Sequence, residues 1–240
     1  MTRSSTTEGS AAEQSAAAEA VRQHSTGTDE SSADIPKLLS DPAARVARHA
    51  QLTEPHVAPL TAYVAALRNE AGPDAAIPDF DPWDGGATAE LLYLLEAPGA
   101  KAVLSGFISR NNPDETAKNF FELNRAAAIP RERTVTWNIV PWYIGTGARI
   151  RAADRSDIEA GLPALTRLLA ILPKLKAAVL VGRKAERAAS LVSQLRPEVR
   201  LFRSPHPSPL FINNARGNRD RILSVLREAA ACLDARDSAV

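Results

Sequence analysis

The feature that most constrains the fold is the alternation of short apolar segments with helical patterns after residue 90. Four segments are apolar or β-rich and are followed closely by proline or glycine, which is typical of buried strands. They are residues 91–95, 134–140, 177–181 and 199–202. Helical patterns follow them at residues 116–128, 162–172, 184–195 and 219–233. Because strands that alternate with helices form βαβ units, we predict an α/β fold. It is a three-layer α/β/α sandwich with a central, mainly parallel four-stranded sheet.

The chain before the first strand divides into two parts. Residues 1–34 are mainly Ser, Thr, Ala, Glu and Gln, and they cannot bury enough apolar surface to offset the entropy of ordering. We expect a disordered tail there. Residues 35–87 carry two helical patterns, the first with Asp41 as its expected N-cap, and predict a helical extension packed on the core. The α/β domain then spans residues 88–235.

Composition excludes several classes of protein. The single cysteine, Cys232, excludes a disulfide framework, a thiolate zinc site and a four-cysteine iron–sulfur cluster. No apolar run approaches the roughly 18 residues needed to span a bilayer, and the start lacks a signal-peptide pattern. We therefore expect a cytoplasmic monomer that uses no metal or other cofactor and does not bind membranes.

The charge is unevenly distributed. Residues 1–100 carry six Lys/Arg against fifteen Asp/Glu, whereas residues 101–240 carry 23 against 13. A basic half on a nearly neutral chain is consistent with a phosphate-binding face, and equally with scattered, solvated arginines.

A proline-rich loop, RSPHPSPL at residues 203–210, holds one of four histidines. Proline fixes φ and keeps the residue before it out of the helical region, so His206 lies in a stiff, extended loop. An isolated His-Pro pair is more often an incidental surface turn. Here, however, Glu96, Asn138, Gly182 and His206 all lie at or just after the ends of predicted strands. Ligands of parallel sheets bind beyond the carboxyl ends of the strands, so we expect a functional site at this rim.

Two of these segments resemble motifs of the uracil-DNA glycosylase superfamily. The strand-to-loop motif of the GEAPG type is matched by EAPG at residues 96–99, and the HPSP motif by residues 206–209. The family places an asparagine at a strand end between them, where this chain has Asn138. The resemblance covers residues 88–231. It departs at Leu95, which replaces the usual glycine, and the lack of cysteines implies a relative without an iron–sulfur cluster.

The resemblance implies a DNA repair enzyme that hydrolyses the N-glycosidic bond of uracil, or a related deaminated base, flipped out of DNA. It implies that Asn138 reads the base with its amide, which offers both a donor and an acceptor. Pro98 and Gly99 would line the base site. A neutral His206 would donate to the base as negative charge develops on it. Glu96 is the candidate acid that orients water or stabilises the cationic sugar, with a strand-end ion pair as its alternative.

The same resemblance suggests where DNA binds. Phe107 is the nearest candidate for an aromatic side chain that stacks on the base. Ser208 would contact phosphates, and Leu210 or Phe211 would either fill the space left by the flipped base or close the core. The stretch from residue 174 to 203 holds eight Lys/Arg against two Glu. It supplies the remaining DNA-binding candidates, Arg183, Lys184 and Arg203.

Two other functions remain open. A catalytically weak homologue that binds damaged DNA is favoured by the departure at Leu95 and by the uncertain role of Glu96. An unrelated α/β hydrolase using His206 with a carboxylate is disfavoured, because the sequence has no GxSxG nucleophile elbow and no glycine-rich phosphate loop.

Overall fold

The computed structural model describes Met1 and residues 33–146 and 149–235. From Asp34 onward the chain forms one compact unit. Most of the predicted tail, residues 1–34, lies outside the described residues. Asp34, assigned to that tail, instead binds Arg131 at 2.8 Å and Asn111 at 2.7 Å. Within the described ranges, no helix is long and apolar enough to cross a membrane.

A parallel four-stranded sheet forms the centre of the unit, as predicted. The order of its strands is β4-β2-β7-β8. Their bounds are Leu91–Leu95 for β2, Thr134–Asn138 for β4, Ala177–Val181 for β7 and Arg200–Ser204 for β8. In this register Leu95 lies opposite Asn138, and Val181 opposite Ser204. The carboxyl ends of neighbouring strands therefore meet at one edge.

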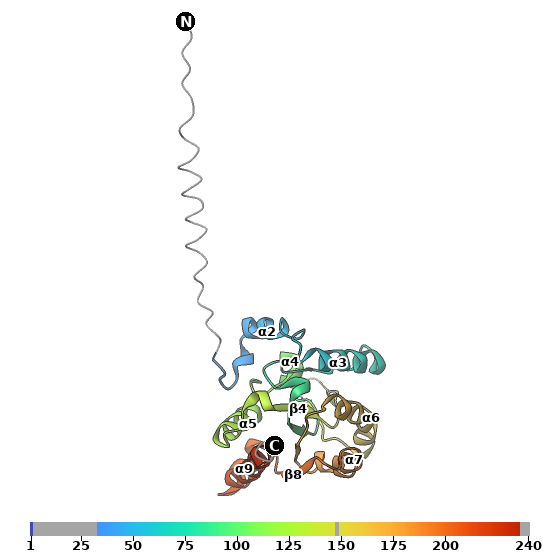
Figure 1. The fold of residues 1–240 in the computed structure, drawn as a ribbon, viewed down its shortest axis with the longest axis vertical. Coiled ribbons are helices and arrows are strands. Elements are labelled where there is room, and N and C mark those ends of the chain that lie inside the picture. Colours follow the sequence, from blue (N-terminus) through green and yellow to red (C-terminus); the bar gives the residue numbers. More distant parts are fainter. Residues whose placement is uncertain (2–32, 147–148, 236–240) are drawn as a thin grey trace. The chain divides into compact units, whose positions relative to one another are not determined.

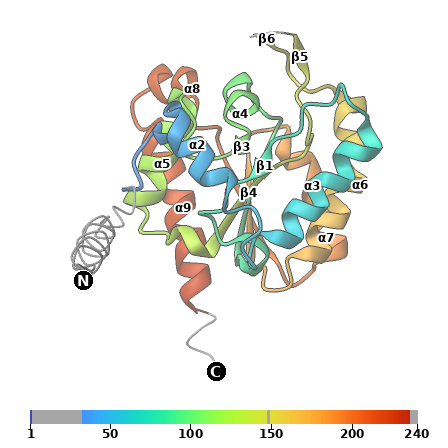
Figure 2. The ribbon, with the colours of Figure 1, turned by 90° about the horizontal axis from the view of Figure 1, so that it is seen from above.

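Helices cover both faces of the sheet and complete the predicted three layers (Figures 1 and 2). Helices α3, α6 and α7 cover one face, and α5 and α9 cover the other. The helices are α2 Pro42–His49, α3 Ala58–Ala71, α4 Ala100–Ser105, α5 Glu115–Ala126, α6 Arg155–Ile171, α7 Ala189–Leu195, α8 Pro209–Asn214 and α9 Asn218–Ala235. Two short pairs flank the sheet, β1 Asp79–Phe80 with β3 Phe107–Ile108, and β5 Gly145–Thr146 with β6 Arg149–Ile150.

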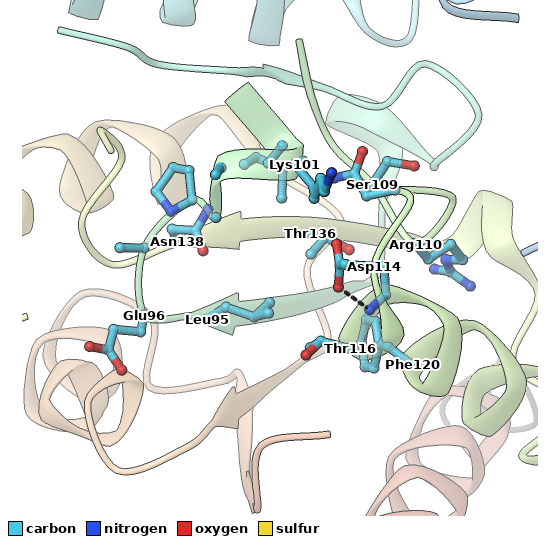
Figure 3. A pocket seen from close by; sticks show the side chains of 18 of the residues that line it. Leu95, Glu96, Lys101, Ser109, Arg110, Asp114, Thr116, Phe120, Thr136 and Asn138 are labelled. Atoms are coloured by element: carbon cyan, nitrogen blue, oxygen red, sulfur yellow. Dashed lines mark hydrogen bonds between the residues drawn. The ribbon is translucent and has the colours of Figure 1, made fainter. Parts of the chain in front are cut away.

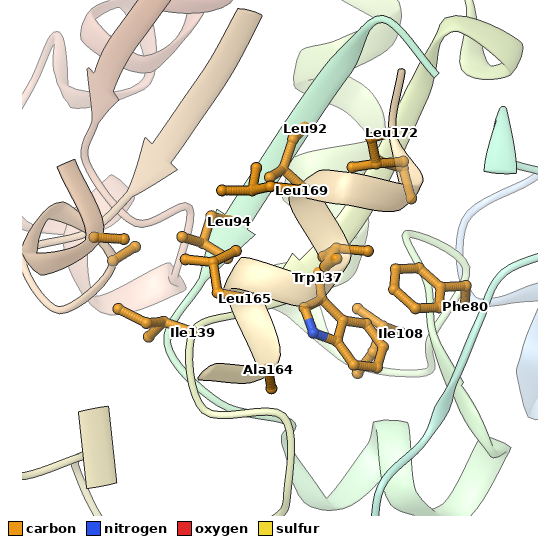
Figure 4. Close-up of a cluster of buried hydrophobic side chains, with 14 of the residues drawn as sticks. Phe80, Leu92, Leu94, Ile108, Trp137, Ile139, Ala164, Leu165, Leu169 and Leu172 are labelled. Atoms are coloured by element: carbon orange, nitrogen blue, oxygen red, sulfur yellow. The ribbon is translucent and has the colours of Figure 1, made fainter. Parts of the chain in front are cut away.

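The core has two parts because the central strands are buried on both faces. Leu92 and Leu94 face the cluster under α3 and α6, whereas Leu91 and Tyr93 face the one under α5 and α9. Successive side chains of a strand point to opposite faces, which explains why the segment reads as continuously apolar. In the first cluster, Trp137 stacks on Phe80 with ring centroids 3.9 Å apart (Figure 4).

Helix α6 starts earlier than the pattern predicts. It begins at Arg155 rather than near residue 162, and Pro163 lies inside the helix instead of in its first turn. The start is set by a capping box, in which the Asp154 carboxylate accepts from the Asp157 N–H at 3.0 Å and the Asp157 carboxylate accepts from the Asp154 N–H at 2.8 Å. The polar first turns carry too few apolar residues to show in the periodicity.

Candidate active site

A pocket of about 890 Å³ opens at the carboxyl ends of β2 and β4, on the side of the sheet covered by α5 (Figure 3). The loop after β2, the face of β4, the first turns of α5 and the HPSP loop line it. Five of the predicted site residues are among the lining residues: Glu96, Pro98, Gly99, Asn138 and His206. Segments that are up to 110 residues apart in the sequence therefore meet around one space.

Asn138 ends β4 and presents its amide to the pocket. Its side chain is only 3% exposed, yet the amide has no hydrogen-bond partner among the described residues. The backbone N–H groups that follow it, of Ile139 and Val140, bind the carbonyls of Leu95 and Glu96 at 2.8 and 3.0 Å. The strand end is thus fixed, while a donor and an acceptor remain free for a ligand.

His206 is half-buried in the wall of the pocket. Burial lowers the pKa of its imidazole below the ordinary 6.5, and the nearby carboxylates of Glu96 and Asp114 only partly oppose this. The ring is therefore neutral at neutral pH and carries one N–H donor. Gly182, at a φ of +84°, packs beneath it, and a Cβ at this position would lie 3.5 Å from the Cβ of His206.

The loop that carries His206 is held on both sides. The Asn119 amide of α5 donates to the Pro207 carbonyl at 3.0 Å. The Ser208 hydroxyl accepts from the Phe211 N–H at 3.3 Å and caps α8. One predicted phosphate contact, Ser208, therefore already has a structural role, although its hydroxyl can still donate.

The Glu96 carboxylate binds backbone rather than a cation. Its Oε1 accepts from the Ala153 N–H at 2.6 Å, and no Lys or Arg of the described ranges forms an ion pair with it. The ammonium group of Lys184, a residue predicted to contact DNA, donates a hydrogen bond to the carbonyl of the same Ala153. The ion pair that the sequence left open as an alternative role for Glu96 is therefore absent among the described residues. One carboxylate oxygen of Glu96 binds backbone, and the other remains free at the edge of the pocket.

A second carboxylate lines the pocket that the sequence pattern did not single out. Asp114 is the N-cap of α5 and accepts from the Ala117 N–H at 2.9 Å (Figure 3). The signal for it was present, because Asp followed by a helical pattern is a common N-cap arrangement. Two carboxylates, Glu96 and Asp114, therefore act electrostatically on His206.

The structure corrects the position of Phe107. Its ring is fully buried and packs against His49, with centroids 4.4 Å apart, and it does not line the pocket. Because β3 pairs with β1, neighbouring residues on it point in opposite directions, and Ile108 reaches the pocket instead. The phenylalanine that lines the pocket is Phe120 of α5.

A buried ion network lies behind the part of the pocket wall that Ser109 forms. Asp81 pairs with Arg48 and Arg131, and Arg131 also binds Asp84 at 2.8 Å. Burial alone would raise the pKa of Asp81, but the two guanidinium groups together with hydrogen bonds from Ser109 and the Trp83 N–H outweigh it and hold that pKa below its ordinary value. The Ser109 hydroxyl donates to Asp81, so the network anchors the segment after β3.

The predicted DNA contacts lie outside the pocket. Arg183 and Arg203 are exposed, and Leu210 of α8 is 85% exposed. Two basic residues not predicted from the pattern, Lys101 and Arg151, line the pocket and are exposed. In the ranges that the structure describes, no group of three His, Cys, Asp or Glu side chains could hold a metal ion.

The sequence matches a known protein family over more than half of its length. The family model of the uracil DNA glycosylase superfamily matches residues 82–230. The crystal structure of SMUG2 from Pedobacter heparinus superposes with a TM-score of 0.50 at 12% identity, over 76% of this chain and 86% of that one. The NMR structure of a candidate uracil DNA glycosylase from Methanosarcina acetivorans gives a TM-score of 0.43 at 16% identity, over 60% and 92% of the two chains. No curated protein matches the sequence.

Proposed function

Because this chain belongs to the uracil DNA glycosylase superfamily, we propose that it removes uracil, or a related deaminated base, from DNA by hydrolysing the N-glycosidic bond. It would act as a cytoplasmic monomer in the first step of base-excision repair. The observation that carries the proposal is the meeting of Glu96, Asn138 and His206 in one pocket at the carboxyl ends of the strands. A base stacked in a duplex cannot reach such a pocket, so it must be flipped out.

The three residues divide the chemistry between them. The Asn138 amide hydrogen-bonds the pairing edge of the flipped base. As the bond from C1′ to the base nitrogen breaks, its electron pair leaves with the base, and the His206 N–H stabilises the negative charge. Water adds to the cationic C1′ and gives up a proton to the free oxygen of Glu96. The base anion takes up a proton from solvent and Glu96 releases its own, so the products are an abasic sugar and the free base.

A uracil-containing oligonucleotide should acquire an alkali-labile abasic site on incubation with the protein in EDTA. The same assay with hypoxanthine and xanthine in place of uracil would identify the preferred base. If none of these oligonucleotides is cleaved while the damaged DNA is still bound, the protein is a binding homologue without catalysis. The Ala153 contact that occupies one oxygen of Glu96 favours this second candidate.

Leu210 is our candidate for the side chain that fills the gap left by the flipped base. Replacing it with Ala should lower kcat/KM on duplex uracil DNA about tenfold, because a buried leucine contact is lost from the complex. Single-stranded uracil DNA has no gap to fill, so its kcat/KM should change little. Leu195→Ala is the matched control, since Leu195 is 43% exposed at the carboxyl end of α7 and does not line the pocket. Equal losses on duplex and single strands would contradict this role.

A further inference from the structure

Ala153, just before α6, is bound by side chains from the ends of two neighbouring strands. Strands β2 and β7 pair in parallel, so Glu96 and Lys184 follow carboxyl ends that lie side by side. The Ala153 N–H donates to the Glu96 carboxylate at 2.6 Å, and the Ala153 carbonyl accepts from the Lys184 ammonium. Ala153 itself is only 1% exposed. One buried residue therefore connects the loops after the two strands.

The segment that carries Ala153 is also attached to α6. Asp154 and Asp157 form the capping box that begins the helix, and the Arg151 guanidinium donates to Asp157 at 2.7 Å. These contacts lie within the segment and the helix, so they do not connect it to the edge of the sheet. Lys184 makes that connection from the loop after β7.

The surroundings of Lys184 suit it to hold this segment. The residue is half-buried and does not line the pocket. An ammonium group that is withdrawn from water needs hydrogen-bond acceptors, and the buried Ala153 carbonyl is one. Hydrogen bonds from a charged donor are stronger than those between neutral groups, so this contact holds the carbonyl firmly.

The position of Ala153 in turn determines the position of the Glu96 carboxylate. Because Oε1 is bound to the Ala153 N–H, the free oxygen at the edge of the pocket is restricted to a narrow range of positions. A catalytic group must be held within about 0.5 Å of its productive geometry. A misplacement of about 1 Å can lower a rate on the order of 10²-fold.

We propose that Lys184 is a positioning residue for Glu96: its ammonium holds Ala153, and Ala153 holds the carboxylate that takes the proton from water. The proposal rests on the proposed function of the pocket and of Glu96. It assigns Lys184 a role different from the phosphate contact that the sequence suggests, because its effect passes through Glu96 and not through DNA. Lys184 therefore acts on the rate of base excision and not on the affinity for DNA.

Replacing Lys184 with Met removes the donor and keeps most of the apolar stem. On duplex uracil DNA, the maximal single-turnover rate should fall roughly tenfold to a hundredfold. The protein concentration that gives half of this rate should change less than about twofold, and its dependence on salt should stay the same. Loss of a phosphate contact would instead reduce the salt slope by about 0.9. Lys184→Arg keeps a charged donor and should recover much of the rate.

A Glu96→Gln background separates positioning from other roles. Gln cannot take a proton from water, so the exact position of this side chain has little further effect on the rate. Adding Lys184→Met to this background should lower the remaining rate less than about twofold, whereas losses that multiply would overturn the inference. Arg187→Met is the matched control, because Arg187 is an exposed cation three residues later that does not line the pocket. It should keep the parent rate in both backgrounds.

Lys184→Gln is a second variant in case Lys184→Met does not fold, as measured by thermal unfolding. Its side chain is one bond shorter than lysine, so it should also lose the contact and slow excision to a similar extent. If neither variant folds, Lys184 is structural and the inference is overturned, as it is if a folded variant keeps the wild-type rate or has a reduced salt slope. If the wild type excises no deaminated base, the proposed function itself fails, and the inference with it.

Discussion

Replacing Glu96 with Gln should slow base excision by about 10²–10⁴-fold, the usual contribution of a positioned acid or base. An amide cannot take a proton from water and does not stabilise a cationic sugar. Gln can still accept from the Ala153 N–H through its oxygen, so the loop after β2 should keep its position. Single-turnover cleavage of uracil DNA measures the rate. Binding of a duplex with a 2′-fluorinated uracil nucleotide, in which the fluorine disfavours the cationic sugar and keeps the base attached, checks that affinity is retained.

Asp114→Asn is the matched control for this experiment. Asp114 lines the same pocket and acts on the same His206, but its carboxylate caps α5, and Asn is an equally good N-cap. We expect this variant to cleave at nearly the wild-type rate. A large loss in Asp114→Asn together with a normal rate in Glu96→Gln would transfer the role of the acid to Asp114.

Much of the fold could be predicted because its central strands are defined locally. Strands β2 and β7 have the bounds that the pattern predicts, since a strand buried on both faces is a short apolar run closed by proline or glycine. The start of helix α6 could not be predicted from apolar periodicity, because side-chain caps in a polar stretch set it, whereas its second half was predicted. The motif residues after the strands were predictable for a similar reason, as strand ends in a parallel sheet share one edge.

The rest of the site depends on contacts between distant parts of the chain. Phe107 was misplaced because the pairing of β3 with β1 decides which way its ring points. The buried pairs of Asp81 with Arg48 and Arg131 join residues 33 and 50 positions apart, and nothing in the local sequence pairs these charges. The pocket wall that Ser109 and Arg110 form has the same origin, since this network anchors their segment through Ser109.

Replacing His206 with Ala should lower the rate of base excision by about 10²–10³-fold, the usual loss when one donor to a developing anion is removed. His206→Gln, which keeps an N–H donor, should recover part of the rate. The pH dependence tests which form of the ring donates. Because burial holds the pKa of His206 below 6.5, the neutral ring predominates between pH 6.5 and 8, and the wild-type rate should change less than about twofold over that range. A rate that rises steadily as the pH falls from 8 to 6.5 would show that the imidazolium is the donor, and an unchanged rate in His206→Ala would remove the residue from the mechanism.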